Sequence, residues 1–166
     1  KRLKSTLAVI IKRRPEPDVS EVTHIVGDVE GKIAVVVDDM ISTGGTLVKA
    51  SEALIKRGAT EVYCLATHGI FAGDAVKQFE SSEIRKVIVT NTIPASAHPD
   101  GTGSRIEQLS IAQILADAIK RITANRSVSE LFASDDFVEG STPTATTTEE
   151  APHLEANAEA AIAAAV

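Results

Sequence analysis

Aromatic residues make up only 3% of the 166 residues, and tryptophan is absent. So few rings exclude base stacking on aromatic side chains as the main binding mode. One cysteine, Cys64, excludes an internal disulfide and fits a reducing compartment. No apolar run reaches the roughly 18 residues of a membrane-spanning helix. We therefore expect a cytoplasmic protein that binds neither nucleic acid nor a membrane.

The negative charge of the chain is concentrated near its C-terminus. Through Phe132, 17 basic residues nearly balance 16 acidic ones, and the other seven acids lie within residues 133–166. That segment is rich in Thr and Ala ("STPTATTTEE", "AEAAIAAAV"), which is typical of a disordered tail, with a frayed helix as the alternative at its end. We predict a folded domain over residues 1–132 and a disordered acidic tail over residues 133–166. The basic start, "KRLK", lacks Met, and we expect a longer protein around this chain.

Apolar strand-like and helix-like segments alternate along the predicted domain. Strands are expected at 7–11, 22–26, 33–37, 61–68 and 86–92, and helices at 47–58, 72–80 and 111–122, with a short turn or helix at 127–132. "KRRPEPD", after the first strand, is expected to be a charged loop, because proline interrupts strand pairing. Strands that alternate with helices predict an α/β fold with a parallel sheet flanked by helices.

The segment "VVVDDMISTGGTL" carries the clearest chemistry. Asp38 and Asp39 follow a buried strand and offer paired acceptors to the vicinal hydroxyls of a ribose, directly or through hydrated Mg²⁺. A loop with glycines and hydroxyls then leads into a helix, where backbone N–H groups bind phosphate. This loop is Ser42, Thr43, Gly44, Gly45 and Thr46. The alternative is a plain strand end, with Thr43 or Thr46 as a helix N-cap. Each element has a separate role in a ribose 5-phosphate site, so we favour the ligand interpretation.

With its flanking segments, this motif resembles a known family. "VVVDDMISTGGTL" is similar to the phosphoribosyl-diphosphate motif of the type I phosphoribosyltransferase fold. "IIKRRPEPDVSEVTHIVGDVEGK", "ATHGIFAGDA", "VTNTIP" and "SVSELF" together resemble the C-terminal half of the class I ribose-phosphate diphosphokinases. The resemblance covers residues 1–132. It implies transfer of the diphosphoryl group of ATP to the anomeric hydroxyl of ribose 5-phosphate, with Mg²⁺ and an activating phosphate.

The resemblance also implies roles for individual residues. Lys12 and Arg14 match a mobile catalytic loop whose cations stabilise the transferring diphosphoryl group. Ser127, Ser129 and Phe132 match a regulatory contact to phosphate or ADP, for which a helix cap with a packed Phe is the alternative. The family's nucleotide-binding loops and most Mg²⁺ ligands belong to an N-terminal half that this chain does not contain. A homo-oligomer of the hexameric type is expected.

Two other functions remain open from the sequence. A phosphoribosyltransferase of nucleotide salvage would share the Asp38–Thr46 motif, and a non-catalytic regulatory subunit of the synthetase type would share most of the chain. Cys64, in the middle of a strand, is expected to be inert packing. His68 should lie near the rim of the site, where a turn hydrogen bond and catalysis are both open.

Overall fold

A computed structural model describes residues 5–16, 19–94, 103–132 and 160–165. Its contacts divide the chain into two units, residues 1–109 with 156–166, and residues 110–155, and each unit is treated by itself. In the described ranges, no helix is both long enough and apolar enough to cross a membrane.

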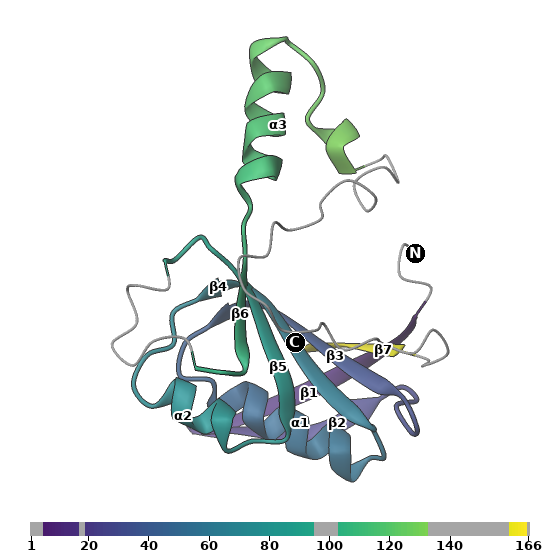
Figure 1. The fold of residues 1–166 in the computed structure, drawn as a ribbon. Coiled ribbons are helices and arrows are strands. Elements are labelled where there is room, and N and C mark those ends of the chain that lie inside the picture. Colours follow the sequence, from purple (N-terminus) through teal and green to yellow (C-terminus); the bar gives the residue numbers. More distant parts are fainter. Residues whose placement is uncertain (1–4, 17–18, 95–102, 133–159, 166) are drawn as a thin grey trace. The chain divides into compact units, whose positions relative to one another are not determined.

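The first unit contains a seven-stranded sheet with the order β2-β1-β7-β3-β4-β5-β6 (Figure 1). The strands are β1 (Thr6–Glu16), β2 (Val19–Val26), β3 (Ile33–Ile41), β4 (Glu61–Gly69), β5 (Ile84–Thr90), β6 (Ile106–Leu109) and β7 (Ala160–Ala165). β1 and β2 pair antiparallel, and all other pairings are parallel. The α/β fold with a mainly parallel sheet, expected from the sequence, is confirmed.

Two helices of this unit, α1 (Gly45–Lys56) and α2 (Ala75–Glu80), lie on the same side of the sheet in Figure 1. Leu47, Ala50 and Leu54 are buried on α1, as the sequence spacing predicts. The helix ends in a Schellman motif, because the amide of Gly58 donates to Ile55 O (2.9 Å) and that of Ala59 to Leu54 O (3.0 Å). Gly58, at φ +92°, is the expected stop of this helix.

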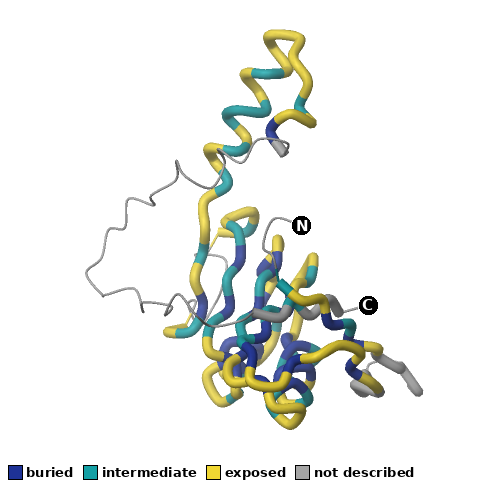
Figure 2. The backbone as a smooth tube through the Cα atoms, turned by 90° about the vertical axis from the view of Figure 1, so that its right-hand side faces the viewer, coloured by how far each residue is buried: buried dark blue, intermediate teal, exposed yellow. Residues whose placement is uncertain are grey.

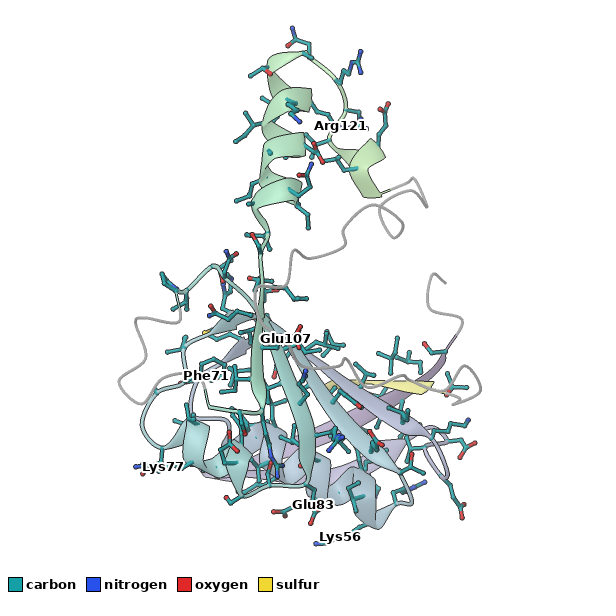
Figure 3. All side chains as sticks on the ribbon, viewed as in Figure 1. Lys56, Phe71, Lys77, Glu83, Glu107 and Arg121 are labelled. Atoms are coloured by element: carbon teal, nitrogen blue, oxygen red, sulfur yellow. The ribbon has the colours of Figure 1, made fainter. Side chains whose placement is uncertain are left out.

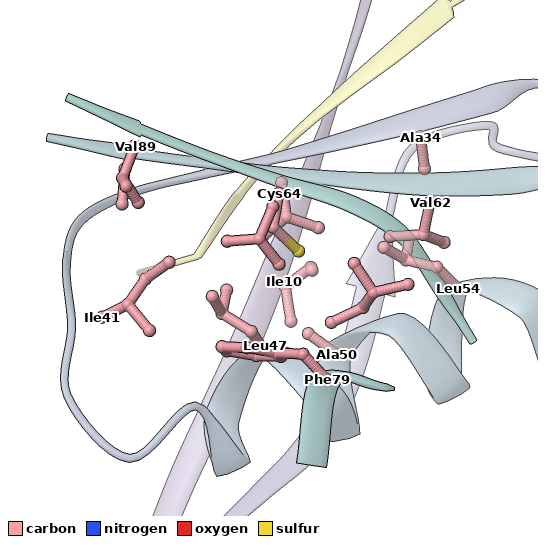
Figure 4. Close-up of a cluster of buried hydrophobic side chains, with 14 of the residues drawn as sticks. Ile10, Ala34, Ile41, Leu47, Ala50, Leu54, Val62, Cys64, Phe79 and Val89 are labelled. Atoms are coloured by element: carbon pink, nitrogen blue, oxygen red, sulfur yellow. The ribbon is translucent and has the colours of Figure 1, made fainter. Parts of the chain in front are cut away.

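The core of the first unit lies between the sheet and these helices. Figure 2 marks the buried residues in dark blue along the backbone. Every second residue of β3 is buried at its start, namely Ala34 and Val36, and β4 shows the same alternation with Val62 and Cys64. In Figure 4 Cys64 lies on the side of the sheet that faces Leu47 of α1 and Phe79 of α2, and both of these side chains are fully or almost fully buried.

The described part of the second unit holds α3 (Ala112–Thr123) and a 3₁₀ helix (Ser129–Phe132). Arg121, labelled in Figure 3, donates to the carbonyl of Ser127 (3.1 Å) and to Oε2 of Glu130 (2.7 Å). These bonds join the end of α3 to the 3₁₀ helix. Both elements were expected from the sequence, with boundaries that shift by one or two residues.

Two local features differ from the expectations drawn from the sequence. The loop predicted at "KRRPEPD" is wrong as far as Glu16, because β1 continues through Lys12 and Arg14 as one arm of the antiparallel hairpin with β2. Pro15 is accommodated because the register is irregular between Arg13 and Glu16, where no ladder amide is needed. β6 was not predicted from the sequence; it pairs with β5 at the far edge of the sheet.

The end of the predicted tail also differs from expectation. Ala160–Ala165 forms strand β7, which pairs in parallel with β1 and with β3. Alanine favours helices, but six residues are too few for a stable isolated helix, and two flanking strands offer backbone partners on both sides. Residues 133–159 lie outside the described residues, so disorder there stays a prediction.

Candidate functional site

Asp38 and Asp39 lie within β3, which runs on to Ile41. They therefore precede the end of the strand, whereas the sequence suggested that they follow it. Asp38 is half-buried and pairs in register with Ala66 of β4, and Asp39 is exposed. Parallel strands present their carboxyl ends at one edge of a sheet, which is where ligands bind in open α/β folds. The two carboxylates thus stand at the edge where a substrate is expected.

The predicted phosphate-binding loop connects this end of β3 to α1. Ser42 and Thr43 are exposed, Gly44 is buried, and α1 begins at Gly45. Gly44 occupies the N-cap position in the left-handed conformation (φ +78°), with no side-chain cap. The alternative that Thr43 or Thr46 caps the helix is therefore wrong.

This loop also has suitable electrostatics for an anion. The first turn of α1 contains no acidic residue that would repel an anion. The helix has 12 residues, over which the peptide dipoles align. The N-terminus of such a helix carries a partial positive charge and presents backbone N–H groups. Gly44 turns the chain from the strand into the helix in the left-handed conformation, which glycine adopts without strain. The arrangement can hold a phosphate group close to the two carboxylates of β3.

A hollow of about 180 Å³ lies beside Asp38, at the carboxyl ends of four neighbouring strands. Its lining residues are Val37, Asp38, Leu65, Ala66, Thr67, Ile88, Val89, Thr90 and Leu109. Thr90 donates from its hydroxyl to the carbonyl of Thr67 (2.7 Å), which ties β5 to β4 at this rim. Among the predicted site residues whose side chains the structure describes, only Asp38 lines the hollow. Sequence reasoning missed Thr67, Thr90 and Leu109, because only the strand order brings them beside Asp38.

His68 lies at the carboxyl end of β4, opposite Met40 in register. Its side chain is exposed, and Nδ1 is 2.8 Å from Oγ1 of Thr92. The hydroxyl of Thr92 also donates to the carbonyl of Thr67 (3.1 Å). Of the two roles open from the sequence, the structure shows the hydrogen bond at the strand end.

Cys64 is buried in the core, as expected. Burial first, and then the nearby Asp38 carboxylate, raise the pKa of its thiol to about 12. The thiolate is the nucleophilic form, so this cysteine is unreactive near neutral pH in the folded protein. It has no chemical role in the candidate site.

Lys12 and Arg14 lie on β1, and the structure describes their backbone but not their side chains. Their catalytic role stays a prediction. Ser127 and Ser129 are exposed in the second unit, and the side chain of Phe132 lies outside the described residues. The structure places Ser129 and Phe132 at the ends of the 3₁₀ helix. The regulatory role of this segment also stays a prediction.

No group of three or more His, Cys, Asp or Glu side chains in the described ranges could hold a metal ion. Mg²⁺ in phosphate-transfer sites is commonly held by one or two carboxylates together with substrate phosphates and water. Asp38 and Asp39 can supply these one or two carboxylates. A complete protein cage for the ion is not present among the described residues.

Comparisons with known proteins match this chain to one family. The family described as the phosphoribosyl synthetase-associated domain matches residues 2–133. A ribose-phosphate pyrophosphokinase of Clostridium acetobutylicum is 46% identical over 134 residues, which are 81% of this chain and 41% of that protein. The corresponding protein of Aquifex aeolicus is 50% identical over 126 residues, which are 76% of this chain and 40% of that protein.

A solved structure is also similar to this chain. The phosphoribosylpyrophosphate synthetase of Mycobacterium smegmatis is similar with a TM-score of 0.57 and 37% identity, over 66% of this chain and 35% of that chain. This chain thus spans about two fifths of the length of the curated relatives that it matches. The family resemblance inferred from five sequence segments is confirmed.

Proposed function

Because this chain belongs to the family of the phosphoribosyl synthetase-associated domain, we propose that it is the C-terminal part of a ribose-phosphate diphosphokinase. The complete enzyme would transfer the diphosphoryl group of ATP to the anomeric hydroxyl of ribose 5-phosphate. The product would be 5-phosphoribosyl 1-diphosphate. The observation that carries this proposal is the sequence of β3 carboxylates, left-handed Gly44 and the N-terminus of α1 at one sheet edge.

The residues of this chain would bind and orient the sugar phosphate. Asp38 and Asp39 would accept hydrogen bonds from the ribose hydroxyls, and the Ser42–Thr46 loop would hold the 5-phosphate. Lys12 and Arg14 would stabilise the negative charge that develops on the transferring group. Mg²⁺, when bound, would neutralise phosphate charge, and Asp38 and Asp39 would hold it directly or through its water.

Regulation, assembly and location follow from the same resemblance. Phosphate or ADP would act at Ser127, Ser129 and Phe132, and the enzyme would form a homo-oligomer in the cytoplasm. A phosphoribosyltransferase would need a base-recognising element, and a regulatory subunit would lack the nucleotide site. The "KRR" and "SVSELF" segments favour the diphosphokinase over the salvage transferase.

The proposal is tested by comparing residues 1–166 with the complete synthetase that contains them. We expect residues 1–166 alone to bind ribose 5-phosphate weakly and to form no diphosphorylated sugar from ATP, because this chain carries the sugar-phosphate part of the site. The complete synthetase should form the product. Product formation by residues 1–166 alone, or no ribose 5-phosphate binding by either protein, would contradict the proposal.

A further inference from the structure

The loop between β4 and α2 is hydrogen-bonded to the start of the phosphate-binding loop. Ile41 O accepts from the amides of Ile70 (2.8 Å) and Phe71 (3.3 Å), and the carbonyl of Ser42 accepts from the amide of Ala72 (3.0 Å). None of the three donors belongs to the predicted site. The position of Ser42 therefore depends on the conformation of a neighbouring loop.

Phe71 holds that neighbouring loop in an unusual conformation. Its φ is +48°, and only Phe71 and Asn125 among the described non-glycine residues have positive φ. Asparagine tolerates this region, whereas a bulky side chain there is strained. Such strain persists only where the surroundings enforce it, and it is often found next to functional sites.

Packing of the Phe71 ring explains why the strained conformation is retained. The side chain is almost fully buried. A Cβ on Gly69 would lie 2.6 Å from Cε2 of Phe71, so the ring lies directly against the backbone of Gly69. The ring also meets that of Phe79 edge to face, with centroids 6.1 Å apart and planes at 85°. Figure 3 labels Phe71 near the carboxyl end of β4.

Phe79 in turn lies against the glycine that turns the phosphate-binding loop. It is fully buried on α2, and Figure 4 shows it in the core beside α1. A Cβ on Gly44 would lie 2.8 Å from Cε1 of Phe79 and closer still to Cζ. The ring tip thus occupies the space where any other residue at position 44 would place its side chain.

We propose that Phe71 and Phe79 are positioning residues that fix the Ser42–Thr46 loop for binding the sugar phosphate, an inference that rests on the proposed function. The Phe71 loop sets the first residue of the phosphate-binding loop through backbone hydrogen bonds. The Phe79 ring sets Gly44, its left-handed turn. The rings of Phe71 and Phe79 contact each other, so the contact to Ser42 and the contact to Gly44 are linked through one pair of side chains. Anion binding by backbone N–H groups requires that these groups be held in place before the ligand arrives.

The test uses residues 1–166 with three single substitutions, titrated with ribose 5-phosphate by ³¹P NMR. Phe71→Asn removes the ring and introduces a residue that tolerates positive φ, so the loop backbone can keep its conformation. Phe79→Leu removes the ring tip next to Gly44. Asn125→Gly is the matched control. Asn125 also has a positive φ, but it belongs to the second unit and not to the predicted site. We expect Kd to rise roughly tenfold for both Phe variants, because misplaced binding groups lose affinity steeply, and to stay unchanged for the control.

A merely structural role is distinguished by a second measurement on the same samples. Thermal unfolding gives each variant's Tm, and all titrations are run well below the lowest one. Lower Tm values with unchanged Kd values would overturn the inference and leave the proposed function intact. Absence of binding by the unsubstituted chain would instead contradict the proposed function.

A double-substitution cycle tests the contact between Gly44 and Phe79 directly. Gly44→Ala alone places a methyl group against the Phe79 ring, and Phe79→Leu makes room for it. We expect Gly44→Ala to raise Kd by a smaller factor in the Phe79→Leu background than in the unsubstituted chain. Equal factors in both backgrounds would mean that Phe79 does not position Gly44.

Discussion

The backbone amide of Asp39 donates a hydrogen bond of 2.9 Å to Oδ1 of Asp38. One oxygen of the Asp38 carboxylate is thus bound to the chain itself. Asp38 is half-buried, whereas Asp39 is exposed, and its carboxylate accepts no hydrogen bond from the described residues. The two adjacent acids, which the sequence presented together as paired acceptors, are therefore not equivalent in the structure.

Replacing both acids tests their role in the complete synthetase. We expect Asp38→Asn combined with Asp39→Asn to reduce kcat/KM by a factor on the order of 10², because both charges act on the reacting sugar and its Mg²⁺. Stability should change little, since asparagine can still accept the Asp39 amide bond through its side-chain oxygen. Steady-state kinetics and chemical denaturation measure the two effects. Near-normal kinetics would leave these acids with a local structural role only.

The left-handed glycine of the phosphate-binding loop has a close internal control. Gly44 (φ +78°) lies against Phe79, whereas Gly73 (φ +61°) has no atom within 4 Å of the position of an added Cβ. We expect Gly73→Ala to cost about 1 kcal/mol of stability from the backbone conformation alone. Gly44→Ala should cost about 2–4 kcal/mol, because overpacking against the ring is added. Urea denaturation of residues 1–166 measures the loss in free energy of unfolding for each variant. Equal losses would show that the Phe79 ring moves aside for the added methyl group without an energetic cost.

The basic residues of β1 give a test of catalysis separate from binding. Lys12→Ala or Arg14→Ala in the complete synthetase should lower kcat by orders of magnitude, if their charges meet the diphosphoryl group only as it transfers. Affinity for ribose 5-phosphate should stay nearly constant, because Asp38, Asp39 and the phosphate-binding loop hold that ligand. Arg13→Ala, between them on the strand, is the control and should have less effect.

Kinetics and a calorimetric sugar-phosphate titration on each variant decide the matter. Equal and mild effects at all three positions would indicate a solvated basic segment. Loss of ribose 5-phosphate binding by Lys12→Ala or Arg14→Ala would mean that these residues contact the sugar phosphate and not the transferring diphosphoryl group.

Local signals made much of this fold predictable from sequence. The spacing of Leu47, Ala50 and Leu54, followed by Gly58, gave α1 because helical periodicity and the C-terminal stop lie within one segment. The motif from Asp38 to Thr46 was recognisable for the same reason. β6 was not, because its four residues become a strand only through pairing with β5, as at Val87 and Ile106.

Non-local packing accounts for the remaining differences at the site. Pro15 suggested a loop, but the hairpin partner β2 and an irregular register accommodate it in β1. The support of Gly44 by Phe79 joins residues 35 positions apart, and no sequence pattern reveals their contact. The rim of the hollow likewise depends on the order of four strands.

The buried thiol of Cys64 predicts a specific dependence of stability on pH. Its pKa is raised from an ordinary value of 9.0 to about 12, first by burial and then by the Asp38 carboxylate. Below pH 9 the thiol is protonated in both the folded and the unfolded chain, so its contribution is constant. Above pH 9 the unfolded chain loses the proton while the folded chain keeps it, and the free energy of unfolding should fall up to about pH 12 by about 1.4 kcal/mol per pH unit.

Cys64→Ala isolates this contribution, because every other ionisable group is present in both proteins and its effect cancels in the difference. At pH 7 the substitution should destabilise residues 1–166 by about 1 kcal/mol, since it removes a buried sulfur from a packed core. As pH rises above 9, the unsubstituted chain alone should lose stability through the thiol, so this difference should shrink and then reverse. Urea denaturation of both proteins at several pH values between 7 and 11 measures it. A difference that stays constant across this range would mean that the folded thiol ionises as readily as the unfolded one, and that burial does not hold it protonated.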